Sequence, residues 1–260
     1  MSAQRATRSG AGKPRGGCGR ARRGRWAHGA GPRYDSGMHA LTFDRFGEPE
    51  VLAWREVADP VVEPGHAMVR IEAAGLNFAD LYRRRGNYHM VATPPWILGY
   101  EGAGRLVTAA EGFAVGQRVA FADAPRANAE LVAVPVDKLI AIPDDIPSEL
   151  AASVLLQGLT AQYLVRDSHA VRAGEVVVVH AAGGGVGLLL VQLAAAAGAR
   201  VIAIASSEAK RQAARAVGAA DCVGDDWLAQ VRALTGGGAD VVYDSVGTTL
   251  VDSLAAARTG

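Results

Sequence analysis

A glycine-rich segment in the second half of the chain has the composition of a phosphate-binding loop. Residues His180 to Gly187 read HAAGGGVG, between the apolar run EVVVVHA (175–181) and the helical pattern GLLLVQLAAAAG (187–198). A second strand pattern, RVIAIA (200–205), ends where a ribose-binding residue belongs. Backbone N–H groups at the start of such a helix point toward an anion, and glycines let a pyrophosphate approach. This context predicts a dinucleotide site rather than a structural turn.

The loop departs at one position from the pattern G-x-G-x-x-G. Ala182 occupies the first glycine position, Gly184 the second and Gly187 the third. We predict cofactor contacts from Gly184, Gly185, Val186 and Gly187, because the second glycine admits the pyrophosphate and the third packs helix against strand.

The end of the second strand pattern predicts which dinucleotide binds. An acidic residue there suits a ribose 2′-hydroxyl, whereas cationic and hydroxyl groups suit a 2′-phosphate. The chain has Ser206 and Ser207 there, followed by Lys210 and Arg211, and its first acid, Glu208, falls in the next helix. The serines also suit the N-cap of that helix, which is compatible with phosphate binding. We therefore predict NADPH, held through Ser206 and Lys210.

Two kinds of pattern position these residues. From Met38 to about Asp144, short apolar runs such as HALTF, AMVRIEAAGL and QRVAFA are separated by Gly and Pro, which is typical of a barrel or sandwich. From Pro147 helical periodicity begins, and strands then alternate with helices as far as the strand pattern at 239–247. Near-continuous apolar strands in such an alternation indicate a parallel sheet covered on both faces. The predicted fold is a β domain followed by an α/β domain.

The first 37 residues differ in composition from the rest. They carry eight arginines and Lys13 against one acid, Asp35, a net charge of +8; the other 223 residues carry 18 bases and 25 acids, or −7. Nine glycines and almost no aliphatic side chains leave too little apolar surface to offset the ordering entropy, so we expect residues 1–37 to be disordered. A nucleic-acid-binding arm, a transit peptide and an upstream extension before a start at Met38 are the alternatives. The extension is favoured, so no nucleic-acid partner is expected.

Cysteine content and hydropathy argue against several classes of protein. Cys18 and Cys222 form neither a disulfide framework nor a four-thiolate metal site, which favours a reducing, cytoplasmic compartment. The apolar run at 186–198 is too short to span a membrane, so no membrane partner is expected.

Several motifs together resemble one enzyme superfamily. From Met38 onward the chain contains, in order, MHALTFDRFGEPEVL, GLNFADLYRRRGNY, LGYEGAG, VGQRVAF, LLQGLTAQYLV, HAAGGGVG and VVYDSVG. This set resembles the medium-chain dehydrogenase/reductase superfamily, specifically its zinc-independent, zeta-crystallin-like quinone oxidoreductase branch. The resemblance implies a GroES-like β-barrel catalytic domain at 38–160 and a Rossmann doubly wound parallel sheet at 161–260. It also implies that full-length relatives are homo-oligomers.

The resemblance implies a reaction and the residues that perform it. Hydride would pass from NADPH to a small-molecule quinone or another conjugated carbonyl such as an enone. The catalytic residues implied are Asn77, Asp80, Tyr82 and Tyr88, and the further cofactor contacts implied are Gln157, Thr160, Val246 and Gly247. Asn and Tyr can donate hydrogen bonds to the developing oxyanion, whereas Asp80 is expected to orient Tyr82 and a backbone loop. Of Arg83, Arg84 and Arg85, at least two are expected on a solvated helix face, with Arg84 at the family-like position.

Zinc ligands of the related metalloenzymes are replaced in this chain. Asn77 stands where those relatives have Cys and Tyr100 where they have His, and only Glu101 remains. Zinc needs Cys, His or carboxylate ligands around an open position, so no metal is expected.

Two alternative functions stay open at this point, and part of the family's expected fold is not legible in the sequence. An enoyl-thioester reductase of the same superfamily would have a similar cleft, and a truncated, non-catalytic nucleotide- or RNA-binding remnant would keep the same loop. The family's Rossmann domain has six strands and its barrel is completed by a returning segment, whereas only four strands are legible before Gly260. We therefore expect an incomplete Rossmann domain. The sequence leaves the physiological substrate and the oligomeric state open.

Overall fold

The computed structural model describes residues 37–90 and 93–259. The chain separates into the units Met1–Asp35 and Ser36–Gly260, and only the second is described below. The disorder predicted for residues 1–37 thus falls, apart from Gly37, outside the described residues.

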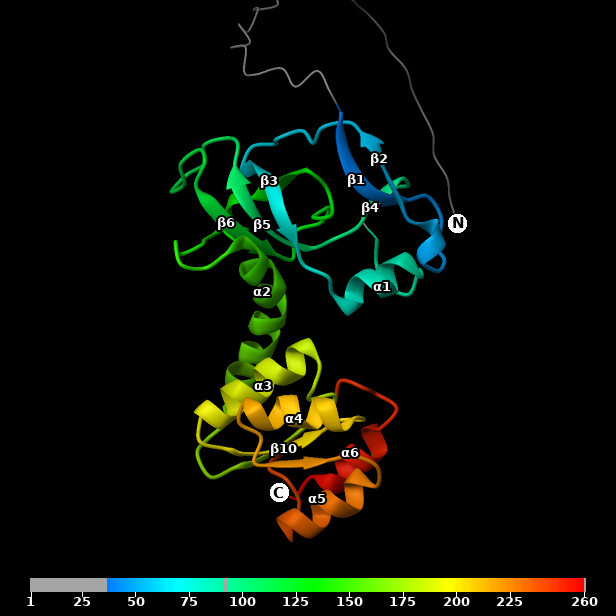
Figure 1. Ribbon diagram of the computed structural model, residues 1–260, viewed down its shortest axis with the longest axis vertical. Helices are drawn as coiled ribbons and strands as arrows, with labels where there is room; N and C mark the ends of the chain where they lie inside the picture. Colours follow the sequence, from blue (N-terminus) through cyan, green and yellow to red (C-terminus); the bar gives the residue numbers. More distant parts are fainter. Residues whose placement is uncertain (1–36, 91–92, 260) are drawn as a thin grey trace, which may run out of the picture. The chain divides into compact units, whose positions relative to one another are not determined.

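The first half of the second unit is an antiparallel β domain (Figure 1). Its strands are β1 (Met38–Phe43), β2 (Ala53–Val57), β3 (His66–Ala74), β4 (Trp96–Ile97), β5 (Glu101–Leu106), β6 (Arg118–Ala122), β7 (Leu131–Pro135) and β8 (Ile140–Ala141). They form two sheets, ordered β2-β1-β4 and β7-β3-β5-β6-β8. Burial alternates in the first half of β3, and Val69, Phe121 and Val132 pack in one core. The β domain predicted from the punctuated apolar runs is confirmed.

Helical elements connect the strands of this domain and follow the last of them. The helix α1 (Phe78–Arg84) follows β3, and 3₁₀ turns occupy η1 (Pro49–Val51) and η2 (Val136–Lys138). Helix α2 (Ser148–Tyr163) continues as a π-helical turn, η3 (Leu164–Ser168). Helix α2 contacts β5 and β6 as well as α3, and it runs through residue 160, where a domain boundary was predicted. That boundary stays a prediction.

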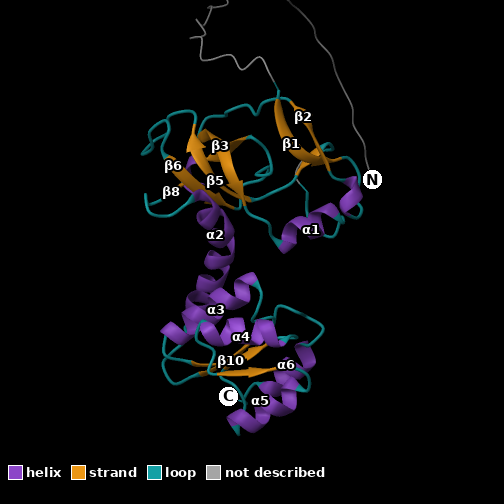
Figure 2. Ribbon diagram, in the orientation of Figure 1, coloured by secondary structure: helices purple, strands orange, loops and turns teal. Residues whose placement is uncertain are grey.

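The second half is a parallel sheet covered by helices on both faces (Figure 2). The strands are β9 (Val176–Val179), β10 (Arg200–Ile204), β11 (Asp221–Val223) and β12 (Val241–Tyr243), ordered β11-β10-β9-β12 and all parallel. The helices are α3 (Gly185–Ala196), α4 (Glu208–Ala216), α5 (Trp227–Thr235) and α6 (Leu250–Ala256). Alternate strand residues enter two cores: Val177 and Val179 pack with Val191 of α3, whereas Val178 packs with Val231 of α5. The Rossmann-like architecture is confirmed.

The strands of this sheet are shorter than their apolar patterns. The pattern at 239–247 yields only β12, because the Asp244 carboxylate accepts hydrogen bonds from the N–H groups of Val246 (2.8 Å) and Gly247 (3.0 Å) and turns the chain. The weak pattern near Cys222 forms the edge strand β11. Among the described strands, β12 pairs with β9 alone.

No helix in the described part of the chain has both the length and the apolar character needed to cross a bilayer. The run at 186–198, the most apolar of the sequence, forms most of α3 and packs against β9 and β10.

Two glycines of the β domain and its helix provide a test of this packing. A Cβ at Gly104 would overlap the carbonyl oxygen of Arg70, where β3 shifts register against β5. Gly104→Ala should therefore lower the free energy of unfolding by roughly 1–3 kcal/mol. A Cβ at Gly158, inside α2, meets nothing within 4 Å, and Gly158→Ala should raise stability by roughly 0.5–1 kcal/mol. Urea melts of both variants that shifted in the same direction would contradict this packing.

Candidate functional site

The glycine-rich loop turns the chain sharply from β9 into α3. Gly184 is the N-cap residue of α3, which begins at Gly185. Ala181 has a φ of 48°, in the left-handed region that non-glycine residues seldom adopt. A Cβ at Gly187 would overlap the carbonyl oxygen of Ala181 and lie 2.8 Å from the Cα of Ala182. The lack of a side chain at 187 thus lets α3 start directly against the loop, as the third glycine of the motif does.

A cavity of about 610 Å³ opens at the carboxyl ends of β9 and β10. Its lining includes loop residues, residues that follow each strand, and the first turn of α4: His180, Gly183, Gly184, Ser206, Lys210, Asp225, Trp227, Val246 and Thr249. The strand order reverses between β9 and β12, and crevices at such a reversal are where open α/β sheets bind ligands. The cavity therefore has the position and size of a nucleotide site.

The predicted cofactor residues fall into two groups relative to this cavity. Gly184, Ser206, Lys210 and Val246 line it. Gly185, Val186 and Gly187 form the first turn of α3, Gly247 lies in the turn after β12, and Gln157 and Thr160 lie on α2.

Of the two α2 residues, Gln157 reaches the loop and Thr160 is turned back on its own helix. A Cβ at Gly185 would overlap the Gln157 side-chain oxygen, so that side chain lies directly against the start of α3. The Thr160 hydroxyl donates to the carbonyl oxygen of Leu156 at 2.8 Å.

On helix α4, Lys210 lies against the loop, whereas Arg211 and Arg215 form ion pairs within the helix. A Cβ at Gly183 would lie 2.5 Å from the Cβ of Lys210, so the backbone of the loop packs directly against α4. Glu208 forms ion pairs with Arg211 and Arg215, both at 2.9 Å, and hydrogen bonds from these arginines hold the pKa of Glu208 below its usual value. No described carboxylate forms an ion pair with Lys210. Ser207 accepts a hydrogen bond from the Lys210 N–H at 3.4 Å and caps α4, whereas Ser206 lines the cavity beside Lys210.

A buried hydrogen-bond chain beneath the cavity was not predicted. The Ser253 hydroxyl donates to Asp244 at 2.8 Å, so its oxygen accepts from the Nε2 of His180 at 3.1 Å. Thr249 also donates to Asp244 at 2.8 Å. Burial raises the pKa of Asp244, but hydrogen bonds from Gly247, Ser253, Thr249 and Val246 outweigh it and hold that pKa well below its usual value.

The chain of hydrogen bonds connects the two strands that flank the strand-order reversal. Burial lowers the pKa of His180, while the charge of Asp244 opposes that shift, so the ring stays neutral near pH 7. The His180 ring also meets the Trp227 ring edge-on, with centroids 4.6 Å apart. His180 and Asp244 both lie inside motifs identified above, and Ser253 had no signal in the sequence.

The predicted catalytic residues gather around α1. Asn77 immediately precedes this helix, and its N–H donates to the Asp80 carboxylate at 3.1 Å. Asp80 is buried and pairs with Arg83 at 3.4 Å. Burial raises the pKa of Asp80, and its partners Asn77 and Arg83 oppose that shift. Among the described residues, the hydrogen bonds of Asp80 thus go to the backbone and to Arg83, and none reaches Tyr82.

The two candidate tyrosines are half-exposed and therefore accessible to a ligand. Tyr82 is 45% exposed and Tyr88 is 44% exposed. Among the described residues neither phenol has a hydrogen-bond partner, and a phenol can donate one hydrogen bond.

The prediction that at least two of the three consecutive arginines are solvated is wrong. Arg83 and Arg84 are each only 5% exposed, and Arg85 alone lies at the surface. The Arg83 guanidinium carbon lies 3.3 Å from the centroid of the Tyr100 ring and 4.8 Å from that of Tyr88. Aromatic faces accept a desolvated guanidinium, which explains the burial. Arg84 points instead to Glu48, at 3.4 Å.

The residues at the metal-ligand positions do not fit zinc. Both Glu101 oxygens accept N–H hydrogen bonds, from Asn77 Nδ2 at 2.8 Å and from the Leu156 N–H at 2.7 Å. The Arg83 cation covers the Tyr100 ring, and a second cation beside it would be repelled. Within residues 37–90 and 93–259 no group of three or more His, Cys, Asp or Glu side chains is arranged to hold a metal. A zinc-independent reaction stays a prediction.

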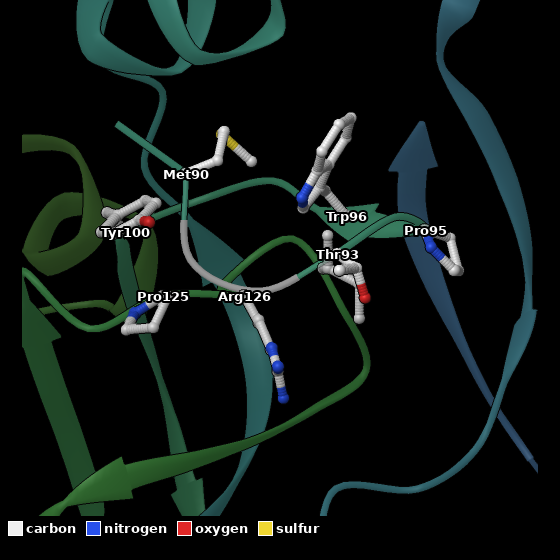
Figure 3. A pocket seen from close by; sticks show the side chains of 8 residues that line it. Met90, Thr93, Pro95, Trp96, Tyr100, Pro125 and Arg126 are labelled. Carbon is white, nitrogen blue, oxygen red and sulfur yellow. The ribbon is translucent and has the colours of Figure 1, made fainter. Parts of the chain in front are cut away.

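A second cavity next to Tyr100 is too small for an organic substrate. It measures about 30 Å³, and Tyr100, Met90, Pro125 and Arg126 contribute to its wall (Figure 3). This volume holds roughly two water molecules. The residues predicted to contact the substrate, Asn77, Tyr82 and Tyr88, lie on or beside α1, whose first residue, Phe78, lines the cavity of about 610 Å³.

Comparison with known protein families identifies both halves of the unit. The model for the alcohol dehydrogenase GroES-like domain matches residues 63–175, and the model for zinc-binding dehydrogenases matches residues 185–260. The second name describes that family, and the metal-ligand positions of this chain carry the residues given above.

Individual relatives are similar over most of the described residues. The quinone oxidoreductase of Pseudomonas aeruginosa is 41% identical over 80% of this chain and 66% of its own length. The 2-haloacrylate reductase of a Burkholderia species is 38% identical over 83% of this chain and 68% of its own. The structure of Escherichia coli quinone oxidoreductase complexed with NADPH superimposes with a TM-score of 0.80 at 33% identity, over 85% of this chain and 70% of that one. The chain thus spans about two thirds of the length of these relatives.

The turn after β12 should depend on the charge of Asp244. The folded-state pKa of Asp244 lies below its unfolded value of about 3.9, so its stabilisation is present above that pH and is lost as the pH falls through the folded pKa. Asp244→Asn should reduce the free energy of unfolding at neutral pH by roughly 2–3 kcal/mol, and the deficit should shrink below about pH 4. Thermal melts from pH 7 to pH 3 measure this, with the exposed Asp252→Asn as control. A deficit independent of pH would contradict the assignment.

Proposed function

Because this chain belongs to the medium-chain dehydrogenase/reductase superfamily, in its quinone oxidoreductase branch, we propose that it transfers hydride from NADPH to a quinone or another conjugated carbonyl. The observation that carries the proposal is the cavity at the strand-order reversal. There a glycine-rich helix start, a hydroxyl and a lysine without an ion pair in the described chain surround one space.

The residues around the cavity fit the parts of a dinucleotide. The N-cap of α3, Gly184, lines the cavity, and the N–H groups of a helix start suit the pyrophosphate. Ser206 and Lys210 suit a 2′-phosphate, because Glu208, the acid at the start of α4, is already paired with Arg211 and Arg215. Asp225 and Asp226 also line the cavity, and among the described residues neither forms an ion pair with Lys210. Gln157, Val246 and Gly247 would hold the nicotinamide half. When bound, NADPH supplies a hydride and leaves as NADP⁺.

The residues of α1 would stabilise the charge that the hydride places on the substrate oxygen. The Nδ2 group of Asn77 and the phenols of Tyr82 and Tyr88 are hydrogen-bond donors on or beside this helix. Arg83 places a positive charge 4.8 Å from the centroid of the Tyr88 ring, which favours a negative oxygen near that phenol. A proton then completes the reduced product. Asp80 holds the Asn77 backbone in place and is not required as a base.

The acceptor is proposed to be a small molecule, and turnover assays discriminate the candidates. NADPH oxidation by this chain would be compared for a simple quinone, a 2-haloacrylate and an enoyl thioester. The proposal predicts turnover with the quinone, and turnover with the thioester alone would favour an enoyl-thioester reductase. NADPH binding without turnover for any acceptor would favour the non-catalytic alternative. Assembly into homo-oligomers and a cytoplasmic location complete the proposal.

Lys210 should select NADPH over NADH. One charge-assisted contact contributes roughly 1.5–3 kcal/mol, so Lys210→Ala should weaken NADPH binding roughly 10- to 100-fold and barely change NADH binding. Arg211→Ala is the matched control, because it removes a neighbouring cation that is held by Glu208 and the Ala205 carbonyl. Fluorescence titrations of both cofactors provide the Kd values, and equal losses for NADPH and NADH in Lys210→Ala would refute the assignment.

Turnover should be indifferent to zinc and to chelators, because Asn77 and Tyr100 occupy ligand positions and both Glu101 oxygens are already hydrogen-bonded. The measurement is elemental analysis of the purified chain together with assays in the presence of a chelator or added zinc. Stoichiometric zinc combined with chelator-sensitive turnover would overturn the zinc-independent mechanism.

A further inference from the structure

A buried carboxylate joins the candidate substrate site to helix α2. Glu101, the first residue of β5, is fully buried. Its Oε2 accepts a hydrogen bond from Asn77 Nδ2 at 2.8 Å, and its Oε1 accepts one from the Leu156 N–H, in the middle of α2, at 2.7 Å. These two contacts connect residues that are far apart in the sequence.

The carboxylate determines the orientation of the Asn77 amide. The half of the Asn77 amide that faces Glu101 is its NH₂ group, which donates to Oε2, and a carboxyl oxygen is the acceptor that this orientation needs. That group carries two hydrogens, and Glu101 uses one of them. The orientation of the amide is therefore fixed, and its second N–H can donate to a substrate oxygen.

Both oxygens of Glu101 are occupied by N–H groups of the protein itself. Burial, with a smaller contribution from the charge of Asp80, raises the pKa of Glu101 above its usual value, and hydrogen bonds from the N–H groups of Leu156, Asn77 and Leu155 oppose that shift without cancelling it. Among the described residues, these partners come from the segment before α1 and from α2, so the carboxyl group joins the two. The role left to Glu101 is to hold its neighbours in place.

Close packing allows the carboxylate little movement. A Cβ at Gly75 would overlap both the Glu101 Oε2 and the carbonyl oxygen of Ala152 in α2. The segment before Asn77, the carboxylate and the helix are therefore in direct contact. Directly after Leu156, α2 carries Gln157.

We propose that Glu101 is a positioning residue for hydride transfer: it orients the Asn77 amide toward the substrate and couples it to the helix that carries Gln157. This role rests on the proposed function, because it matters for turnover only if Asn77 stabilises the developing oxyanion. The orientation of the amide itself does not depend on turnover.

The test is the isosteric variant Glu101→Gln in the full chain, with Glu72→Gln as matched control. Glu72 is also a hydrogen-bonded carboxylate of this domain, with Arg105 at 2.8 Å and Ser148 at 2.6 Å, but it does not contact Asn77. If the new amide at position 101 keeps its oxygen toward the Leu156 N–H, its NH₂ group faces Asn77 and forces that side chain to reverse. We expect the ¹H–¹⁵N signals of the Asn77 side chain to shift in Glu101→Gln and to stay in place in Glu72→Gln.

We expect Glu101→Gln to slow turnover and to leave NADPH binding nearly unchanged. Loss of one oriented donor should lower kcat roughly 10- to 100-fold in Glu101→Gln, with the NADPH Kd within about twofold of the parent. Unchanged Asn77 signals, or shifted signals with unchanged kcat, would overturn the proposal. If the parent chain itself shows no turnover, the proposed function fails, and the amide signals alone then decide whether Glu101 orients Asn77.

A double variant separates positioning from simple stabilisation. Asn77→Asp combined with Glu101→Gln exchanges donor and acceptor and keeps a hydrogen bond between the two positions. We expect it to restore the melting temperature but not kcat, since an ionised Asp offers the substrate no donor. Restored turnover would show that only the hydrogen bond mattered and would overturn the proposal. This variant decides the matter even if Glu101→Gln alone does not fold.

Discussion

Backbone contact around the glycine-rich loop is the constraint on which the nucleotide half of the molecule depends. Side chains are excluded at Gly183 by α4, at Gly185 by Gln157 of α2, and at Gly187 by the loop's own carbonyl. Three helices can therefore approach one turn of the chain. Because the helices lie so close, Lys210 of α4 and Gly184, the N-cap of α3, both line the cavity. Any side chain at these positions would push the helices apart and widen the site.

Hydrogen-bonded carboxylates hold the neighbours of both halves of the proposed site in place. Asp244 holds the turn after β12 and, through Ser253, contacts His180 at the end of β9. Glu101 similarly connects the segment before α1 with the middle of α2. Buried polar groups without partners are costly, so hydrogen bonds of this kind restrict their neighbours to a few geometries. A hydride-transfer site needs such restraint, because reacting atoms must be held within a few tenths of an ångström.

The fold and the loop were predictable because their signals are local. Strand–turn–helix order around Gly184, the apolar strands and the punctuated β pattern all lie within short windows of sequence, and the structure confirms the architecture they imply. The burial of Arg83 was not predictable in this way, because its stacking partner Tyr100 follows 17 residues later and belongs to another element. The hydrogen bond between His180 and Ser253 spans 73 residues and leaves no pattern in the sequence. The strand after Asp240 was predicted too long, because apolar content does not show where Asp244 turns the chain.

The central claim is that the cavity recognises a 2′-phosphate, and competing fragments of the cofactor test it most directly. Trp227 lines the cavity and provides an intrinsic fluorescence signal for titration of the chain with 2′,5′-ADP and with 5′-AMP. The account predicts that 2′,5′-ADP binds at least about tenfold more tightly, because one charge-assisted contact is worth roughly 1.5 kcal/mol or more. Equal affinities for the two fragments, or tighter binding of 5′-AMP, would contradict it.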